Sequence, residues 1–250
     1  MSEHVIVTDE AGIRTIRIYR PEKKNALTLA MYEAMIAALD SASISDAVRC
    51  VLIAGVPGAF SAGNDLADFL AAAAGDSGFN RAALRFLPAI VSCRKPLVAA
   101  VSGVAVGIGT TMLLHCDFVV AGTDALFSTP FVGLGLIPEA GSTLIVPRLM
   151  GQRRAFELLV MGHPLNATRA KDYGIANLVV DPQDVDAEAL KAAREIAALP
   201  PGAVAAARAL MSGESEELQL HIDQESRIFS ERLRSPEAKA AFEAFFARKR

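Results

Sequence analysis

The sequence has no tryptophan, three cysteines and four histidines, and it carries no excess of basic charge. Neither the cysteines, which are odd in number and scattered, nor the histidines show metal-ligand spacing, so a disulfide framework and a metal site are both disfavoured. Lys and Arg number 25 against 28 Asp and Glu, so the net charge of −3 provides no basic field for nucleic-acid binding. We therefore expect a reduced, cytoplasmic protein without a metal; the residues concerned are Cys50, Cys93, Cys116, His4, His115, His163 and His221.

A transmembrane segment is also disfavoured. Residues 96–116 carry no formal charge over 21 positions, which is about the length that a bilayer requires. However, the stretch contains Pro96, three glycines and several polar side chains, so we interpret it as a buried strand, a glycine turn and a buried helix. The N-terminal run MSEHVIVTDEAGIR is charged early and lacks an apolar centre, which is not typical of a signal peptide.

The length and composition predict one large folded domain, or one domain with a small appended piece. Apolar residues make up 52% of the 250 and charged residues 21%, which excludes intrinsic disorder, and 45 alanines favour helix. Short apolar runs alternate with helical patterns, which predicts an α/β fold with parallel strands joined by crossovers. Strands are expected at 4–8, 13–19, 50–54, 97–101, 118–121 and 178–180, and helices from 28, 65 and 109, at 141–161, 167–173, 184–198 and 202–211, and from 214 onward with a break at 235–236.

The run Leu-Pro-Pro-Gly at 199–202 marks a change of character along the chain. We expect an α/β core at 1–200 and a helical region at 201–250. Aromatic side chains on the last helix, such as Phe242, are typical of packing against a neighbouring subunit, so the helical region is predicted to support a homo-oligomer.

Two glycine-rich segments have the same character. Residues 58–66 and 102–110 each follow a buried strand, precede a helix and contain mostly small residues. Such segments can leave backbone N–H groups free to bind a ligand oxygen, so two of them side by side predict an anion or oxyanion site. The alternative is that both are tight turns without a ligand.

Glu139 is the third feature, because no other formal charge lies between Asp124 and Arg148. A carboxylate among apolar neighbours tends to have a raised pKa and can carry a proton near neutral pH. The alternative is that Glu139 is a favourable charge in the first turn of the following helix.

Other signals are weaker. Ser61, His115 and Asp117 suggest a hydrolase triad by residue type, but the motif G-x-S-x-G and the chain order of hydrolases are absent. The run at 107–109 lacks the third glycine of a dinucleotide loop.

Taken together, several motifs resemble the crotonase, or enoyl-CoA hydratase/isomerase, superfamily. They are RPEKKNAL at 20–27, FSAGNDL at 60–66, KPLVAAVSGVAVGIG at 95–109, CDFVVA at 116–121, FSTPFVGLGLIPEAGST at 127–143 and the tail FEAFFARKR. The resemblance implies a spiral of ββα turns, a C-terminal helical trimerisation region, a trimer or dimer of trimers, and a CoA thioester substrate in fatty-acid metabolism. It implies no cofactor beyond the coenzyme A of the substrate.

The resemblance also implies roles for individual residues. The backbone N–H groups of Asn64 and Ile108 are expected to form the oxyanion hole for the thioester carbonyl. CoA phosphates are expected at Arg20, Lys23 and Lys24, with help from the basic tail at Arg248, Lys249 and Arg250. Further substrate contacts are expected from Ala62, Asp65, Leu66, Gly107, Phe131 and Leu134.

The carboxylates separate the activities within the family. The positions of the two hydratase glutamates look like Thr111 and Phe131 here, whereas Glu139 resembles the base of the peroxisomal-type 3-enoyl-CoA to 2-enoyl-CoA isomerases. The predicted activity is therefore an enoyl-CoA isomerase with Glu139 as its proton shuttle. The alternatives are a hydratase that uses another carboxylate such as Asp68, and a CoA-binding or RNA-binding member without catalysis.

Overall fold

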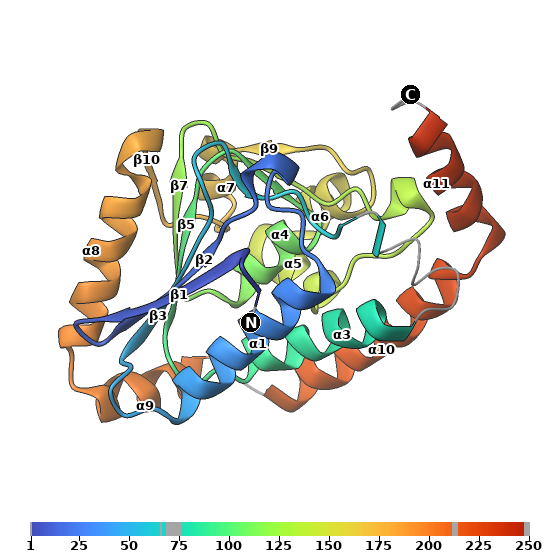
Figure 1. Cartoon of the computed structure of the whole chain (residues 1–250). Helices are drawn as coiled ribbons and strands as arrows, with labels where there is room; N and C mark the ends of the chain where they lie inside the picture. Colours follow the sequence, from blue (N-terminus) through green and yellow to red (C-terminus); the bar gives the residue numbers. More distant parts are fainter. Residues whose placement is uncertain (1, 66, 69–76, 212–214, 248–250) are drawn as a thin grey trace.

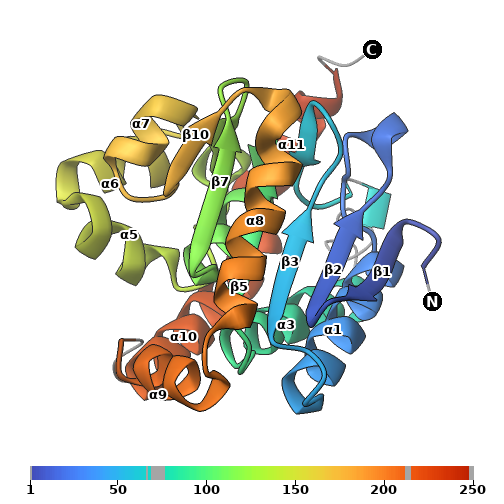
Figure 2. The ribbon, with the colours of Figure 1, turned by 90° about the vertical axis from the view of Figure 1, so that its left-hand side faces the viewer.

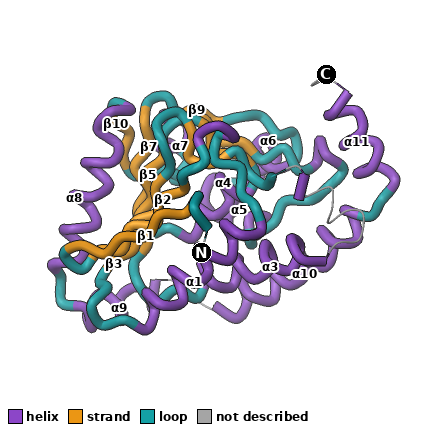
Figure 3. The backbone as a smooth tube through the Cα atoms, viewed as in Figure 1, coloured by secondary structure: helices purple, strands orange, loops and turns teal. Residues whose placement is uncertain are grey.

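The computed structural model describes the chain except for residues 1, 66, 69–76, 212–214 and 248–250. Its described part is a mixed α/β structure with two sheets and helices on both sides of the larger one (Figure 1). Figure 3 shows the strands at the centre of this part and helices around them.

The larger sheet has the strand order β1-β2-β3-β5-β7-β10. β1 and β2 form an antiparallel hairpin, and the pairs from β2 to β10 are parallel. The strands are β1 (Val5–Glu10), β2 (Ile13–Ile18), β3 (Cys50–Ala54), β5 (Leu97–Val101), β7 (Phe118–Gly122) and β10 (Leu178–Val180).

The smaller sheet has the order β4-β6-β8-β9, and each of its first three strands follows a strand of the larger sheet. A helix follows each such pair, so the chain winds as successive ββα turns, and the predicted spiral is confirmed. The strands are β4 (Ala59–Ser61), β6 (Val104–Val106), β8 (Leu126–Ser128) and β9 (Leu165–Asn166).

Strand side chains divide between two apolar cores because successive residues point to opposite faces of a sheet. In β3, Cys50, Leu52 and Ala54 belong to a small core beneath helix α8 (Val185–Ala198). Val51 and Ile53 belong to the main core on the other face. Figure 2 shows α8 lying over its face of the sheet.

The main core is covered by helices that follow the strands in sequence. Thr28 caps α1 by accepting a hydrogen bond from the N–H of Met31. The remaining elements up to α8 are the 3-10 helix η1 (Pro21–Lys23), α1 (Leu29–Ile44), α3 (Ser77–Val91), α4 (Ile108–Thr111), η2 (Met112–His115), η3 (Val132–Leu134), α5 (Ser142–Met150), α6 (Gln152–Leu159), α7 (Ala167–Asp172) and η4 (Pro182–Asp184). Much of the helical stretch expected from residue 65 lies outside the described residues.

Two expectations about the elements are wrong. The segment 141–161 is two helices rather than one, because Gly151 adopts φ +82° between α5 and α6. The strands expected from the sequence also leave out two that the structure shows, because each glycine-rich segment contains a short strand of the smaller sheet, β4 or β6.

The C-terminal helices are α9 (Pro201–Met211), α10 (Ser215–Leu233) and α11 (Pro236–Ala247). Ile222, Phe229 and Phe242 from α10 and α11 are buried in the main core, while Leu210 and Met211 at the end of α9 are 84% and 87% exposed. The homo-oligomer expected from this region remains a prediction. Among the described residues, we find no helix with both the length and the apolar character needed to span a membrane.

Candidate active site

The two glycine-rich segments lie side by side because β4 and β6 pair in parallel. Glycines allow the close approach. A Cβ on Gly63, whose φ is +85°, would lie 2.8 Å from the carbonyl oxygen of Val106, and a Cβ on Gly109 would lie 2.7 Å from that of Ser61. Larger side chains would force the segments apart, so these positions require glycine.

The backbone N–H groups of Asn64 and Ile108 have no hydrogen-bond acceptor in the part of the chain that the structure describes. On either side of Asn64, Leu27 donates to the carbonyl of Gly63 at 2.8 Å and Asp65 donates to that of Leu27 at 2.8 Å. Ile108 begins α4, so its N–H has no partner within the helix. Two donors are therefore available to a ligand oxygen.

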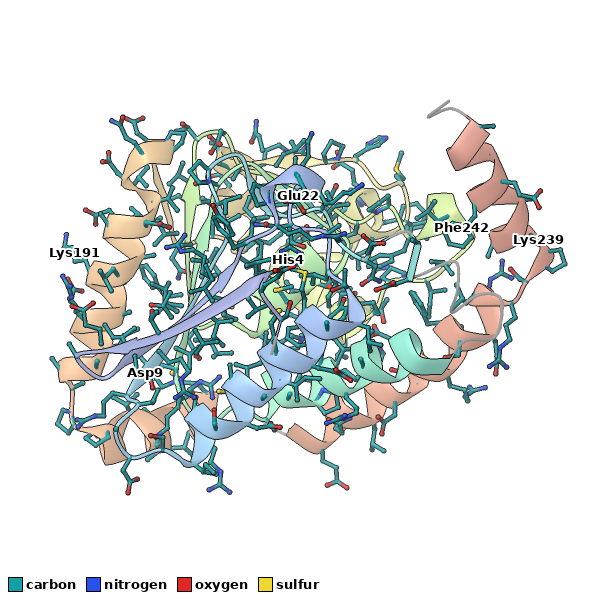
Figure 4. The ribbon with its side chains drawn as sticks, viewed as in Figure 1. His4, Asp9, Glu22, Lys191, Lys239 and Phe242 are labelled. Carbon is teal, nitrogen blue, oxygen red and sulfur yellow. The ribbon has the colours of Figure 1, made fainter. Side chains whose placement is uncertain are left out.

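These donors border a cavity of about 630 Å³. Glu22 and Phe242, labelled in Figure 4, approach it from η1 and from α11. Its apolar wall includes Phe131, which is buried and packs edge-on against Phe229 with ring centroids 6.3 Å apart. The cavity is lined by Glu22, Lys23, Lys24, Ala26, Ala62, Gly63, Asn64, Asp65, Ala67, Val106, Gly107, Ile108, Pro130, Phe131, Leu134, Leu136 and Phe242.

Most residues that the sequence analysis expected at a substrate site therefore border one cavity. Lys23 and Lys24 are exposed at its edge, and neither takes part in an ion pair within the described residues. Leu66, Arg248, Lys249 and Arg250 lie outside the described residues.

Arg20 is not among the described residues that line the cavity. Its guanidinium donates to the carboxylate of Asp65 at 2.7 Å and to the carbonyl of Ala26 at 3.1 Å, so it braces the cavity wall. Burial raises the pKa of Asp65, but hydrogen bonds from Arg20 and from backbone N–H groups outweigh burial, and the net pKa is lowered.

Glu139 lies in the loop before α5, not in the first turn of that helix, so the interpretation as a helix-terminal charge is wrong. Its carboxylate accepts a hydrogen bond from the hydroxyl of Thr111. Thr111 in turn belongs to α4, whose first residue, Ile108, borders the cavity. The Glu139 side chain is mostly buried and is not among the cavity-lining residues; its link to the cavity is the hydrogen bond from Thr111, three residues after the cavity-lining Ile108.

The surroundings of Glu139 raise its pKa to about 8. Burial is the main cause, the hydrogen bond from Thr111 lowers the pKa in part, and the nearby charge of Glu225 raises it further. A carboxyl group with a pKa near neutrality can both take up and return a proton under physiological conditions.

Two residues near the site were missed by the sequence analysis. Tyr32 of α1 donates to the side-chain carbonyl of Asn64 at 2.5 Å. Burial raises the pKa of Tyr32, and the charge of Glu139 raises it further. Glu225 of α10 is 3% exposed and influences the pKa of Glu139. Tyr32 and Glu225 lie on helices whose sequence pattern indicates an amphipathic helix and gives no sign of a site.

The contacts of the residues considered for another base, a hydrolase triad or a metal site do not favour these alternatives. The carboxylate of Asp68 accepts from the N–H of Leu29 at 3.0 Å, at the start of α1. Ser61 donates to the carbonyl of Asn25 at 3.0 Å, and His115 bonds the carbonyl of Ala140 at 2.8 Å, so neither faces the other as a triad would. Across the described residues, no group of three or more His, Cys, Asp or Glu could hold a metal ion.

The chain belongs to the enoyl-CoA hydratase/isomerase family, whose model matches residues 8–250. The expected superfamily is therefore confirmed. The family comprises crotonase-type enzymes, and this chain is one of them by sequence and by fold.

Two relatives and one solved structure show how similar this chain is to known proteins. The chain is 36% identical to Enoyl-CoA delta isomerase 2 of Rattus norvegicus over 99% of its own length and 64% of the relative, so it spans about two thirds of that protein. It is 32% identical to 1,2-epoxyphenylacetyl-CoA isomerase of Escherichia coli over 100% of this chain and 97% of that one. The structure of OdaA from Pseudomonas aeruginosa matches with a TM-score of 0.93 and 46% identity, over 98% and 99% of the two chains.

Proposed function

We propose that this protein binds an acyl-CoA thioester and converts a 3-enoyl-CoA to the trans-2-enoyl-CoA, with Glu139 as the proton shuttle. One observation carries the proposal. A carboxyl group with a pKa of about 8 accepts a hydrogen bond from Thr111 of α4, and the first residue of this helix supplies one of the two backbone N–H donors that border the cavity without an acceptor among the described residues.

Substrate binding would use the two ends of the cavity differently. Lys23 and Lys24 would attract the phosphates of CoA at the exposed edge, together with the predicted contribution of Lys249. The acyl chain would lie against Phe131, Leu134 and Leu136. The thioester oxygen would accept hydrogen bonds from the N–H groups of Asn64 and Ile108.

The reaction would require one base. The ionised carboxylate of Glu139 would remove a proton from C2, and the electron pair left behind would delocalise over the diene and the thioester oxygen as a dienolate. Each N–H donor at such an oxygen is typically worth about 3 to 4 kcal/mol in the transition state. The protonated Glu139 would then return its proton at C4, which leaves the double bond between C2 and C3.

Hydration is the runner-up, and the site favours it less. Adding water to a 2-enoyl thioester requires one group to deprotonate water at one carbon and a proton to be delivered at the other. Thr111 and Phe131 stand where the family resemblance puts the two hydratase glutamates, and neither can act as a general base. A relative described as a probable enoyl-CoA hydratase from Rhizobium meliloti is 30% identical over 99% of this chain, so the assay below includes hydration.

We also propose that the protein assembles as a homotrimer or dimer of trimers. The exposed apolar side chains at the end of α9 support an interface there. Light scattering would give the mass in solution, and a 26.4 kDa species alone would contradict the proposal.

The test of the activity compares wild type with Glu139→Gln on a 3-enoyl-CoA and on a 2-enoyl-CoA. We expect conversion of the 3-enoyl substrate in wild type and a loss of about 10³-fold in kcat for the variant, because the amide cannot accept the proton. The affinity for the CoA ester should change little. Hydration of the 2-enoyl substrate that survives in the variant would contradict the assignment of Glu139.

A further inference from the structure

The loop that carries Glu139 has an unfavourable backbone. Ala140 and Gly141 both adopt left-handed conformations, with φ of +64° and +69°. For a residue with a Cβ, such as Ala140, this conformation costs about 1 to 2 kcal/mol. It persists only where the surrounding structure holds it, and such strain concentrates at functional sites.

Two side chains, the partly buried His115 and the buried Glu225, hold this loop from opposite directions. His115 of η2 bonds the carbonyl oxygen of Ala140 at 2.8 Å, and burial lowers the pKa of His115 to about 4, so the neutral ring acts as a donor. Glu225 of α10 accepts from the N–H of Gly141 at 2.6 Å. The single peptide group that joins Ala140 to Gly141 is thus held at its carbonyl by η2 and at its N–H by α10.

Glu225 makes further contacts at the start of α5. Its carboxylate accepts from the N–H and the hydroxyl of Thr143, at 3.0 and 2.5 Å. The ring of His221, one turn earlier on α10, lies 3.7 Å away. Within the described residues, Glu225 forms no ion pair with a lysine or arginine, so neutral donors supply most of its stabilisation.

The titratable groups around Glu139 come from three elements. Tyr32 belongs to α1, His115 to η2, and Glu225 and His221 to α10. Among them Glu225 is the acid whose charge raises the pKa of Glu139, and burial raises the pKa of Glu225 itself.

We propose that Glu225 is a positioning residue for the base, because it fixes the backbone that carries Glu139 through hydrogen bonds from Gly141 and Thr143. Its charge also raises the pKa of Glu139, which gives this role a readout in the pH profile. The inference rests on the proposed role of Glu139 as the proton shuttle. A base that must also return its proton benefits from a neighbouring charge that holds the proton on the carboxyl group after the first step.

The test is the pH profile of kcat/KM for Glu225→Gln. The amide has nearly the same shape but no charge, and it cannot accept all three hydrogen bonds in the same geometry. We expect the acid limb of the profile to move to lower pH, because the pKa of Glu139 falls when the repelling charge is removed. We also expect kcat to fall about 10- to 100-fold with little change in KM, as for a displaced catalytic group.

Glu217→Gln is the matched control. Glu217 also lies on α10 and also contacts α5, through Arg148 at 2.7 Å, but it is half exposed. The same substitution there should leave both kcat and the acid limb unchanged. Glu225→Asp retains the charge but shortens the side chain, so we expect a lower kcat with an acid limb close to that of wild type.

An unchanged acid limb in a folded Glu225→Gln protein would overturn the inference, whatever the loss of kcat. If that variant does not fold, Thr143→Ala replaces it, because it removes one donor from the same carboxylate; an unchanged limb and kcat would then overturn the inference. Failure of the proposed function is distinguished by the assay above, because wild type would then convert no 3-enoyl substrate, or Glu139→Gln would keep the wild-type rate.

Discussion

Glu139 is subject to opposing influences that can be removed one at a time. The Thr111 hydroxyl stabilises the ionised carboxylate, whereas burial and Glu225 destabilise it. In Thr111→Val the pKa of Glu139 should rise above about 8, because the stabilising hydrogen bond is lost. Because the free enzyme needs an ionised base, the acid limb of kcat/KM should move to higher pH, opposite to the shift expected for Glu225→Gln.

The control for this prediction is Thr111→Ser, which keeps the hydroxyl and should restore the wild-type limb. The measurement is kcat/KM for the 3-enoyl substrate between pH 5 and 10. Identical limbs in the valine variant and the wild type would show that Thr111 does not influence the reacting carboxyl group.

Some of the site residues were predictable because they lie within short motifs. Lys23, Asn64, Ile108 and Phe131 all border the cavity and all lie in the motifs that carry the family resemblance, while their roles in substrate binding stay predictions. Glu225 was not predictable, because it meets Gly141 across 84 positions of sequence and lies in an ordinary amphipathic pattern. Contacts of this kind are created by tertiary packing and have no local signal.

At the scale of the secondary-structure elements, Asn25 joins the two sheets. It is fully buried and has φ +57°. Its side-chain amide donates to the backbone carbonyls of Ile18 in β2 and of Ala59 and Phe60 in β4. Its side-chain carbonyl accepts from the backbone N–H of Arg20. Asn25→Ala should lower the free energy of unfolding by about 3 kcal/mol or more, because several buried polar groups lose their partner. Urea denaturation would measure this loss.

Asn166→Ala is the control for Asn25. Asn166 is an exposed residue that caps α7 by accepting from the N–H of Arg169 at 2.9 Å, so its loss should cost about 1 kcal/mol. Equal losses in the two variants would mean that Asn25 acts as a local turn residue and not as a link between sheets.

The elements were predictable in proportion to their length and pattern. β3, β5 and β10 were predicted with their observed bounds, because each is an apolar run between polar segments. β4 and β6 were missed because each has three residues inside a glycine-rich stretch. The two left-handed residues before α5 were also missed, because only one of them is a glycine.

At the scale of the whole molecule, the C-terminal helices complete the core instead of merely adjoining it. α10 contributes Ile222 and Phe229 to the main apolar core, and α11 contributes Phe242 to the cavity wall. The same helices supply Glu225. Side chains from both sides of the predicted boundary near residue 200 therefore pack in one apolar core and border one cavity.

The raised pKa of Glu139 should make the free energy of unfolding of the whole molecule depend on pH. The pKa of its carboxyl is about 8 in the folded protein and near the ordinary 4.5 in the unfolded chain. Between these values the folded state binds a proton that the unfolded state has released, so the free energy of unfolding falls as pH rises through this window. Below it both states are protonated, and the carboxyl makes no such contribution.

Glu139→Gln removes this contribution while keeping the size of the side chain. The variant should therefore be more stable than wild type at pH 8, by on the order of 2 kcal/mol after allowance for partial exposure, and the difference should shrink toward pH 5. Contributions from groups that are not coupled to Glu139 are common to both proteins and cancel in the comparison. Urea denaturation at pH 5, 6.5 and 8 would measure the trend.

Glu217→Gln again provides the control, because the pKa of Glu217 is lowered by its hydrogen bond with Arg148. Its titration lies below this window, so the difference from wild type should stay constant between pH 5 and 8. A constant difference for Glu139→Gln as well would mean that Glu139 is ionised throughout the window. The carboxyl group would then lack the raised pKa that a reversible proton shuttle requires, and the proposed mechanism would lose its physical basis.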